Sequence, residues 1–203
     1  MQLSIITLGH VHAEALVALA AHFTHLENLA LDVPHGDAVS KHRAEFNRAV
    51  DASTADWMLI IREHEFIDSA MAKEIADTVS GAKAWGFRFR AVPYYAGAPL
   101  RLGGSSGSGG EVRLFHKRHY IRFAAKGEWD EIAIQGTIVR MSGEIRSVTF
   151  ESEGEHRAWL EKSATRRAPL ARIALFVRYA ISAGTLDRNA LRYLWIEAGF
   201  SPR

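Results

Sequence analysis

The chain of 203 residues contains no cysteine, which excludes disulfide bonds, a thiol nucleophile and any zinc or iron–sulfur site with cysteine ligands. Its net charge of +2 is too small to indicate a nucleic-acid-binding protein. No apolar stretch approaches the roughly 20 residues that span a bilayer, and the first residues lack the basic start of a signal peptide. We therefore expect a cytoplasmic protein without a membrane-spanning segment.

The composition that is present is that of an ordinary globular protein, with 48% hydrophobic and 24% charged residues. The length suits one domain, or one domain with a helical tail. Charge is unevenly distributed, because residues 1–110 carry a surplus of three acidic residues and residues 111–203 a surplus of five basic ones. This asymmetry favours an anionic partner for the C-terminal half.

The first half alternates between short apolar runs and helical patterns. Residues 3–8, 29–33 and 57–61 are typical of buried strands, and residues 13–23, 40–52 and 68–79 of helices. This order predicts an α/β fold with a parallel sheet that helices cover on both faces. Ligands of such sheets bind at the carboxyl ends of the strands, so the segment 62–65 is the first place to look for chemistry.

The second half is less regular. Residues 86–95 and 112–115 are strand-like, and residues 132–138 and 145–150 predict a hairpin that turns at Ser142 and Gly143. Residues 156–167, 169–182 and 188–198 predict helices. The glycine-rich segment 103–110 is either a surface loop or a mobile lid, and it lacks the Gly-Lys-Ser/Thr ending of a P-loop.

Several short motifs occur in a fixed order along the chain. They are Asn47, Ala-Asp-Trp-Met-Leu at 55–59, Glu65, Gly-Phe-Arg-Phe-Arg at 86–90, Tyr-Tyr-Ala-Gly at 94–97, Val-Arg-Leu-Phe at 112–115 and Gly-Glu-Trp-Asp-Glu at 127–131. Together they resemble the inverting family 2 glycosyltransferases, most closely the branch that builds lipopolysaccharide core. The resemblance implies a GT-A fold. It divides residues 1–155 into a Rossmann-like nucleotide-sugar half (1–85) and an acceptor half (86–155), with a helical tail at 156–203.

The resemblance also implies the site residues. Glu131 takes the position of the base that accepts the proton of the acceptor hydroxyl. Asp130 would raise the pKa of Glu131 if both side chains converged, although neighbours in a strand point to opposite faces. The positions implied to surround a nucleotide-sugar donor are Thr7, Asp32, Asn47, Arg62, His64, Glu65 and Arg113.

The sequence departs from this family where the family binds its metal. Arg62 and His64 replace the two aspartates that hold magnesium or manganese, and only Glu65 keeps the pattern. One hypothesis is that Arg62, with His64 and Arg113, neutralises the donor diphosphate without a metal. The alternative is that the metal site has decayed, and that the protein is a non-catalytic relative that binds or scaffolds. A divalent cation stays open as a cofactor, but its usual carboxylates are absent.

Two further patterns concern partners. Basic residues at 157–178, beside an apolar stripe, are typical either of a helix that docks on the anionic inner face of a membrane or of a solvated helix on the domain. The histidines His10, His12, His22 and His25 raise a third alternative, a histidine-bound zinc, although their spacing is weak for a metal site. We expect no nucleic-acid partner.

Overall fold

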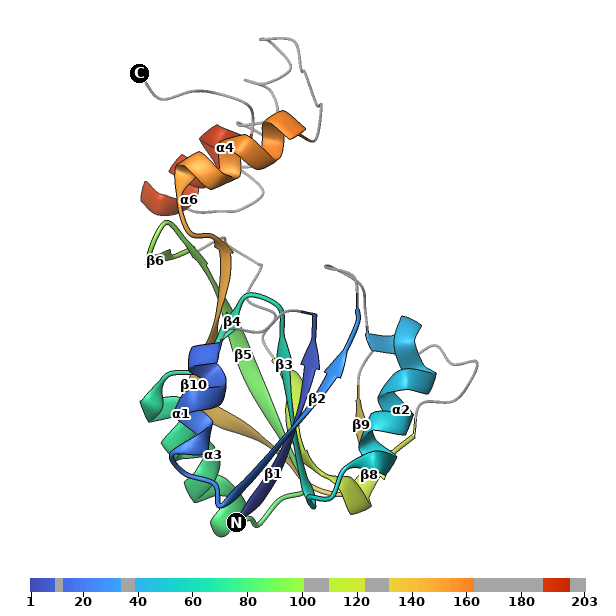
Figure 1. The fold of residues 1–203 in the computed structure, drawn as a ribbon. Coiled ribbons are helices and arrows are strands. Elements are labelled where there is room, and N and C mark those ends of the chain that lie inside the picture. Colours follow the sequence, from blue (N-terminus) through green and yellow to red (C-terminus); the bar gives the residue numbers. More distant parts are fainter. Residues whose placement is uncertain (10–12, 34–38, 101–109, 123–131, 163–187, 198–203) are drawn as a thin grey trace. The chain divides into compact units, whose positions relative to one another are not determined.

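The computed structural model describes residues 1–9, 13–33, 39–100, 110–122, 132–162 and 188–197 (Figure 1). Its helices are α1 (Ala13–Ala20), α2 (Arg43–Ala52), α3 (Ser69–Ser80), α4 (Glu153–Lys162) and α6 (Arg188–Glu197), with 3-10 turns η1 (Val39–His42) and η2 (Lys117–His119). Its strands are β1 (Gln2–Leu8), β2 (His25–Leu31), β3 (Trp57–Arg62), β4 (Glu65–Phe66), β5 (Gly86–Tyr95), β6 (Ala98–Pro99), β7 (Glu111–His116), β8 (Tyr120–Ile121), β9 (Ala133–Ile134) and β10 (Ile138–Phe150).

The main sheet has the strand order β2-β1-β3-β7-β5-β10-β4. Strands β2, β1 and β3 are parallel, and their register places Leu8 beside both Leu31 and Arg62 at the carboxyl edge. Since β2 and β3 lie on opposite sides of β1, right-handed crossovers place the connecting helices on opposite faces. Figure 1 shows this arrangement, with α1 and α3 on one face and α2 on the other.

Both faces of this sheet are buried, as the apolar runs predict. One face packs its odd-numbered β1 residues against α1 and α3, with Leu19 and Ile75 fully buried. The other packs Ile6 and Ile60 against Phe46 of α2. The predicted α/β class, with helices on both faces, is therefore confirmed. The parallel part comprises three strands, because β7 joins β3, and β5 joins β7, in the antiparallel sense.

Element boundaries agree best where strands lie inside the sheet. β1, β3, β5 and β7 coincide with the predicted runs to within a residue at each end. The predicted strand at 29–33 instead begins at His25 and ends at Leu31, because β2 is an edge strand that accommodates polar residues such as Glu27 and Asn28. Helix α3 begins where predicted, since the Asp68 carboxylate caps it by accepting from the Met71 N–H at 2.9 Å.

The predicted hairpin at 132–150 is wrong. Residues 138–150 form the single strand β10, and Gly143 lies inside it rather than in a turn. The Glu74 carboxylate of α3 accepts hydrogen bonds from the Ser142 N–H at 3.0 Å and the Gly143 N–H at 3.3 Å. A Cβ at Gly143 would lie 2.6 Å from Glu74 Oε2 and 2.8 Å from Met71 Sδ. The glycine therefore permits a close approach of helix to strand, not a reversal of the chain.

The chain separates into two compact units, residues 1–90 with 109–145 and residues 91–108 with 146–203. In the second unit, the fully buried His156 ring stacks between Phe150 and Tyr193, and its Nδ1 lies 3.3 Å from the Tyr95 hydroxyl. Burial raises the pKa of Tyr95 to about 12. The predicted functional division at residues 85 and 155 stays a prediction. In the described part of the chain, no helix combines the length and apolarity needed to cross a membrane.

A polar network ties β1 to β2 and to the loop before β3. The Ser4 hydroxyl donates to Glu27 Oε2 at 2.5 Å, the Ser53 hydroxyl donates to Ser4 Oγ at 2.7 Å, and the Thr54 N–H donates to Glu27 Oε2 at 3.0 Å. Ser4 and Ser53 are buried. These donors, the Ser4 hydroxyl foremost, lower the pKa of Glu27 although burial opposes the shift.

Replacing Glu27 with glutamine is therefore expected to lower the free energy of unfolding by about 1 kcal/mol at pH 7. Since the folded pKa is the lower one, this contribution is present above the unfolded pKa and disappears as the pH falls through the folded value. Urea unfolding at pH 7 and at low pH measures it. Glu45→Gln, which changes an exposed carboxylate, is the control. If the free energies of unfolding of Glu27→Gln and Glu45→Gln differ by the same amount at both pH values, the prediction is contradicted.

Candidate functional site

The carboxyl end of β3 turns sharply into β4. His64 adopts φ +62°, a left-handed conformation that is uncommon for a residue other than glycine. The Glu63 N–H donates to the carbonyl oxygen of Leu8 at 2.9 Å, which fixes the turn to the end of β1. The turn brings the side chain of Glu65 back to its start, where Glu65 Oε2 accepts from the Arg62 N–H at 2.7 Å. Backbone strain of this kind is typical of functional sites.

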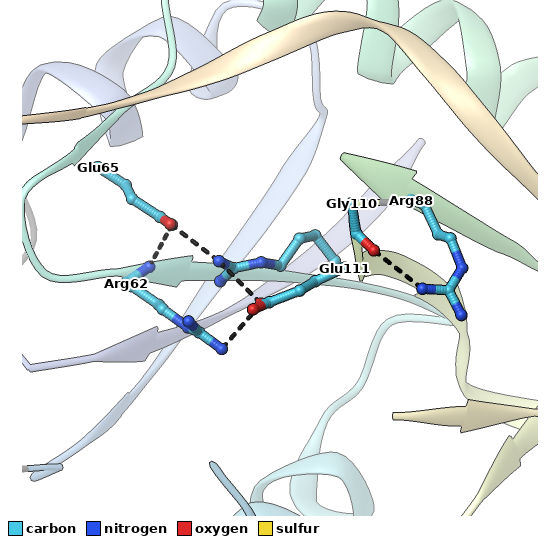
Figure 2. A network of polar contacts seen from close by, with 6 residues as sticks. Arg62, Glu65, Arg88, Gly110 and Glu111 are labelled. Atoms are coloured by element: carbon cyan, nitrogen blue, oxygen red, sulfur yellow. Dashed lines mark hydrogen bonds and ion pairs between the residues drawn. The ribbon is translucent and has the colours of Figure 1, made fainter. Parts of the chain in front are cut away.

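Glu65 is the buried centre of the site. Its residue is 2% exposed, and its second oxygen, Oε1, accepts from Arg113 Nη2 at 2.9 Å. Arg113 is equally buried, at 3%. Figure 2 shows the Glu65 carboxylate with one contact to the Arg62 backbone and one to a guanidinium. Two opposite charges buried together stabilise each other only as a pair, so the positions of Glu65 and Arg113 depend on one another.

A β-bulge aims Arg113 at this site. In the β5–β7 register Phe87 is opposite Leu114 and Arg88 is opposite Val112, so Arg113 is an extra residue without a partner on β5. Such a residue departs from the alternation of the strand, and bulges often redirect a side chain beside an active site. Val112 and Leu114 stay in the apolar core while Arg113 reaches Glu65.

The Glu111 carboxylate contacts the guanidiniums of both Arg62 and Arg113. Glu111 Oε2 lies 2.8 Å from Arg62 Nη2 and 3.1 Å from Arg113 Nη2. Figure 2 shows the Arg62 side chain pointing at this carboxylate. Burial lowers the pKa of the Arg62 guanidinium, the neighbouring Arg113 charge lowers it further, and Glu111 and Glu65 counteract the shift. Two like charges are thus held side by side by two carboxylates.

Gly110 and Arg88 fix the backbone at the start of β7. Gly110 has φ +64°, and a Cβ there would lie 2.4 Å from the carbonyl oxygen of Phe89. Only glycine fits this position. The carbonyl oxygen of Gly110 accepts from Arg88 Nη1 at 2.9 Å (Figure 2). Arg88 therefore holds the backbone just before β7, and the strand that carries Glu111 and Arg113 has a defined starting point.

The residues present do not fit a divalent cation. Magnesium and manganese require several free oxygen ligands. Both oxygens of Glu65 already accept hydrogen bonds, and the positions of the two usual carboxylates are Arg62 and His64. In the described ranges, no group of three or more His, Asp or Glu side chains could hold a metal ion. The cluster holds instead two arginines paired with two carboxylates.

The structure brings Arg62, Glu65 and Arg113 together, and their predicted role around a donor stays a prediction. His64 lies in the same turn, with its ring 3.7 Å from Glu63 Oε1. Thr7 is buried near the carboxyl end of β1, beside Ile61 in the register.

The remaining predicted donor residues have other surroundings. Asp32 is exposed and directly follows β2. Asn47 lies on α2 and accepts a hydrogen bond from the Tyr120 hydroxyl at 2.7 Å. The predicted catalytic residues Asp130 and Glu131 lie outside the described residues, as do His10, His12 and most of the basic segment 157–178. The roles of all these residues stay predictions.

Sequence reasoning missed Glu111 and Arg88. Glu111 has a local signal, since an acidic and a basic residue two positions apart in a strand-like segment, Glu111 and Arg113, form a common ion-pair pattern. Arg88 has no such signal, because its partner is a backbone oxygen 22 residues away.

No known family profile matches the sequence, and no curated protein matches it. Among solved structures, three crystal structures of TarS (residues 1–349) from S. aureus each align over 98% of this chain at 11% identity. The TM-scores are 0.41 for TarS 1–349 and 0.44 for its complex with UDP-GlcNAc, each over 79% of the TarS chain, and 0.45 for its complex with UDP, over 70% of it. With TM-scores below 0.5, these similarities do not assign the chain to a family or give it an activity.

Proposed function

We propose that this chain is a GT-A-type glycosyltransferase that binds the diphosphate of a nucleotide-sugar at the cluster of Arg62 and Arg113. It transfers the sugar, with inversion, to a saccharide or lipid-linked acceptor of cell-surface polysaccharide or lipopolysaccharide. The observation that carries the proposal is the pair of guanidiniums at the carboxyl edge of a β-α-β-α-β sheet, both within 3.1 Å of one carboxylate oxygen. The acceptor class rests on the sequence motifs alone.

The position and chemistry of the pair support a diphosphate ligand. Ligands of such sheets bind outside the carboxyl ends of the parallel strands, where Arg62 ends β3. The planar guanidinium forms two parallel hydrogen bonds with phosphate oxygens and keeps its charge when partly buried. The Arg62 side chain is 40% exposed, so it can reach a ligand, whereas the buried Arg113 supplies a fixed charge behind it.

In the proposed reaction an oxygen of the acceptor attacks the anomeric carbon, and the bond from that carbon to the diphosphate oxygen breaks. The acceptor proton passes to a base, for which Glu131 is the predicted residue. The diphosphate leaves with the bonding electrons, and its negative charge grows as the bond breaks. Arg62 and Arg113, with His64 in the adjoining turn, would stabilise that charge electrostatically.

Titration of UDP and GDP by calorimetry in the presence of EDTA tests the binding step. Wild-type protein is expected to bind at least one of them, and Arg62→Ala to weaken that binding about tenfold or more, since a hydrogen bond to a charged group contributes about 1.5–3 kcal/mol. Arg48→Ala is the matched control, because Arg48 is an exposed arginine on α2 paired with Glu45. Binding that is absent, or equal in all three proteins, overturns the diphosphate site.

One observation favours a second candidate, a non-catalytic relative that keeps the fold and binds or scaffolds. Glu65, the last carboxylate of the metal motif, is saturated by Arg62 and Arg113, and the metal site is not formed. Release of sugar or nucleotide from UDP- and GDP-sugars, with and without magnesium or manganese, separates the two candidates. No turnover under any condition, or trace turnover unchanged by Glu131→Gln, supports the non-catalytic one.

Contact with a membrane stays a separate prediction. In the described part of the basic segment, Arg157 of α4 lies 3.9 Å from Glu153 of the same helix. Sedimentation with anionic vesicles measures this contact independently of donor binding.

A further inference from the structure

The Glu111 carboxylate occupies the place between the two guanidiniums where an anionic ligand would bind. One atom, Oε2, bridges Arg62 Nη2 at 2.8 Å and Arg113 Nη2 at 3.1 Å. A single oxygen that accepts from two guanidiniums is the arrangement that a phosphoryl oxygen adopts between two arginines. The protein therefore already holds one of its own anions at this place.

The carboxylate does not use all the donors that converge there. Among the residues that the structure describes, Arg62 Nε and Arg113 Nη1 have no hydrogen-bond partner, although both atoms are buried. A buried donor without a partner costs free energy. The Arg113 side chain is only 4% exposed, so bulk water does not satisfy it. A phosphate group presents three oxygens in place of the single bridging oxygen, and can reach more of these donors.

The two carboxylates of the cluster differ in how firmly they are held. Glu65 is 3% exposed and bonded through both oxygens, so it is a permanent part of the site. The Glu111 side chain is 45% exposed. The backbone just before Glu111 is held in place, because Gly110 has no room for a Cβ and the Gly110 carbonyl oxygen accepts a hydrogen bond from Arg88. The Glu111 side chain can therefore rotate into solvent while β7 stays in place.

Charge explains why such an anion would be present. Arg62, Arg113, Glu65 and Glu111 sum to zero, so the empty site holds no uncompensated charge. Without Glu111 the same cluster would carry +1, with two partly desolvated guanidiniums facing each other. If the Glu111 carboxylate leaves only when a ligand anion arrives, the charges of Arg62 and Arg113 are neutralised both with and without the ligand.

We propose that Glu111 is an internal competitor of the phosphate ligand, and that the ligand binds by displacing this carboxylate from between Arg62 and Arg113. The inference rests on the proposed function and adds a selectivity to it. A singly charged anion gains little by replacing one carboxylate with another. A diphosphate, with more charge and more acceptor oxygens, gains enough to displace it. Glu111 thus rejects small anions and admits diphosphates.

The test compares wild-type protein, Glu111→Gln and Glu144→Gln by calorimetric titration with pyrophosphate, UDP and acetate. Glu144 is the matched control, because its side chain is also 45% exposed and paired with one arginine, Arg90, at 3.0 Å. Glu111→Gln is expected to bind pyrophosphate about tenfold more tightly than wild-type protein, as the loss of one competing charge implies. It is also expected to bind acetate, which wild-type protein and Glu144→Gln exclude.

The outcomes separate this inference from the proposed function. Tighter pyrophosphate binding in Glu111→Gln, without any binding of UDP, supports the competitor and overturns the nucleotide-sugar site. Binding of UDP with equal affinities in wild-type protein and Glu111→Gln overturns the competitor and leaves the site intact. If no variant binds any anion, both fail.

A second variant guards against a folding defect. Glu111→Asp keeps the charge but shortens the side chain by one methylene, so it bridges the guanidiniums less well and should show an intermediate affinity. The order Gln tighter than Asp tighter than Glu in folded protein, with folding checked by circular dichroism, supports the proposal. Any other order contradicts it.

Discussion

Replacing Glu65 with glutamine is expected to lower the free energy of unfolding by about 3 kcal/mol or more. The variant keeps the shape of the side chain but leaves Arg113, whose side chain is 4% exposed, with Glu111 as its one remaining ionic partner among the residues that the structure describes. It also weakens the acceptor of the Arg62 N–H. For a chain of this length, such a loss lowers Tm by on the order of 10 °C. Thermal and urea unfolding of the two proteins measure it.

Two further variants show whether the uncompensated charge is the cause. Glu144→Gln removes a carboxylate from an exposed pair with Arg90, and should change stability by less than about 1 kcal/mol. The double variant Glu65→Gln with Arg113→Met removes both buried charges, and should be more stable than Glu65→Gln alone. If it is less stable, the destabilisation comes from packing rather than from the arginine charge.

Replacing Gly110 with alanine is expected to lower the free energy of unfolding by about 3 kcal/mol. The new Cβ would lie 2.4 Å from the carbonyl oxygen of Phe89 and 2.8 Å from its carbonyl carbon, and backbone atoms cannot move aside as a flexible side chain can. The start of β7 would have to shift, and Glu111 and Arg113 would shift with it. Anion binding should therefore be lost together with stability, as unfolding and pyrophosphate titration would measure.

Gly97→Ala is the control that separates the cost of the left-handed backbone from the cost of a steric clash of the new Cβ. Gly97 has φ +78°, close to the value at Gly110, but nothing in the described part of the chain lies within 4 Å of an added Cβ. Alanine there should cost only the left-handed conformation, about 1 kcal/mol. Equal effects of the two substitutions would show that the contact with Phe89 is relieved easily.

Local patterns were sufficient for the part of the fold in which neighbours in sequence determine the structure. The apolar run of β3 and the cap of α3 at Asp68 are readable from a few consecutive residues. The error at Gly143 has a different origin. A glycine after a serine is typical of a turn, and only the approach of Glu74, 69 residues earlier in the chain, makes it part of a strand.

Local sequence patterns are equally insufficient to predict the contacts within the candidate site. The segment 62–65 is the expected position of a site because it follows a buried strand in an α/β sheet, and the family resemblance singles out Arg62 and Glu65 within it. That Glu65 is buried, and that both its oxygens are taken, depends on Arg113, 48 residues away. Arg113 reaches it because of a bulge whose register involves Phe87 and Arg88, and no short pattern in the sequence encodes that register.

The bulge at Arg113 also bears on how this protein could change over evolutionary time. Residues in a regular strand are constrained by alternation, because each must suit the face on which it falls. An extra residue escapes this constraint, so position 113 can change while Val112 and Leu114 stay in the core. Its constraint comes instead from position 65. Among relatives of this chain, residues 65 and 113 should vary together, as a coupled pair that can change without altering the sheet.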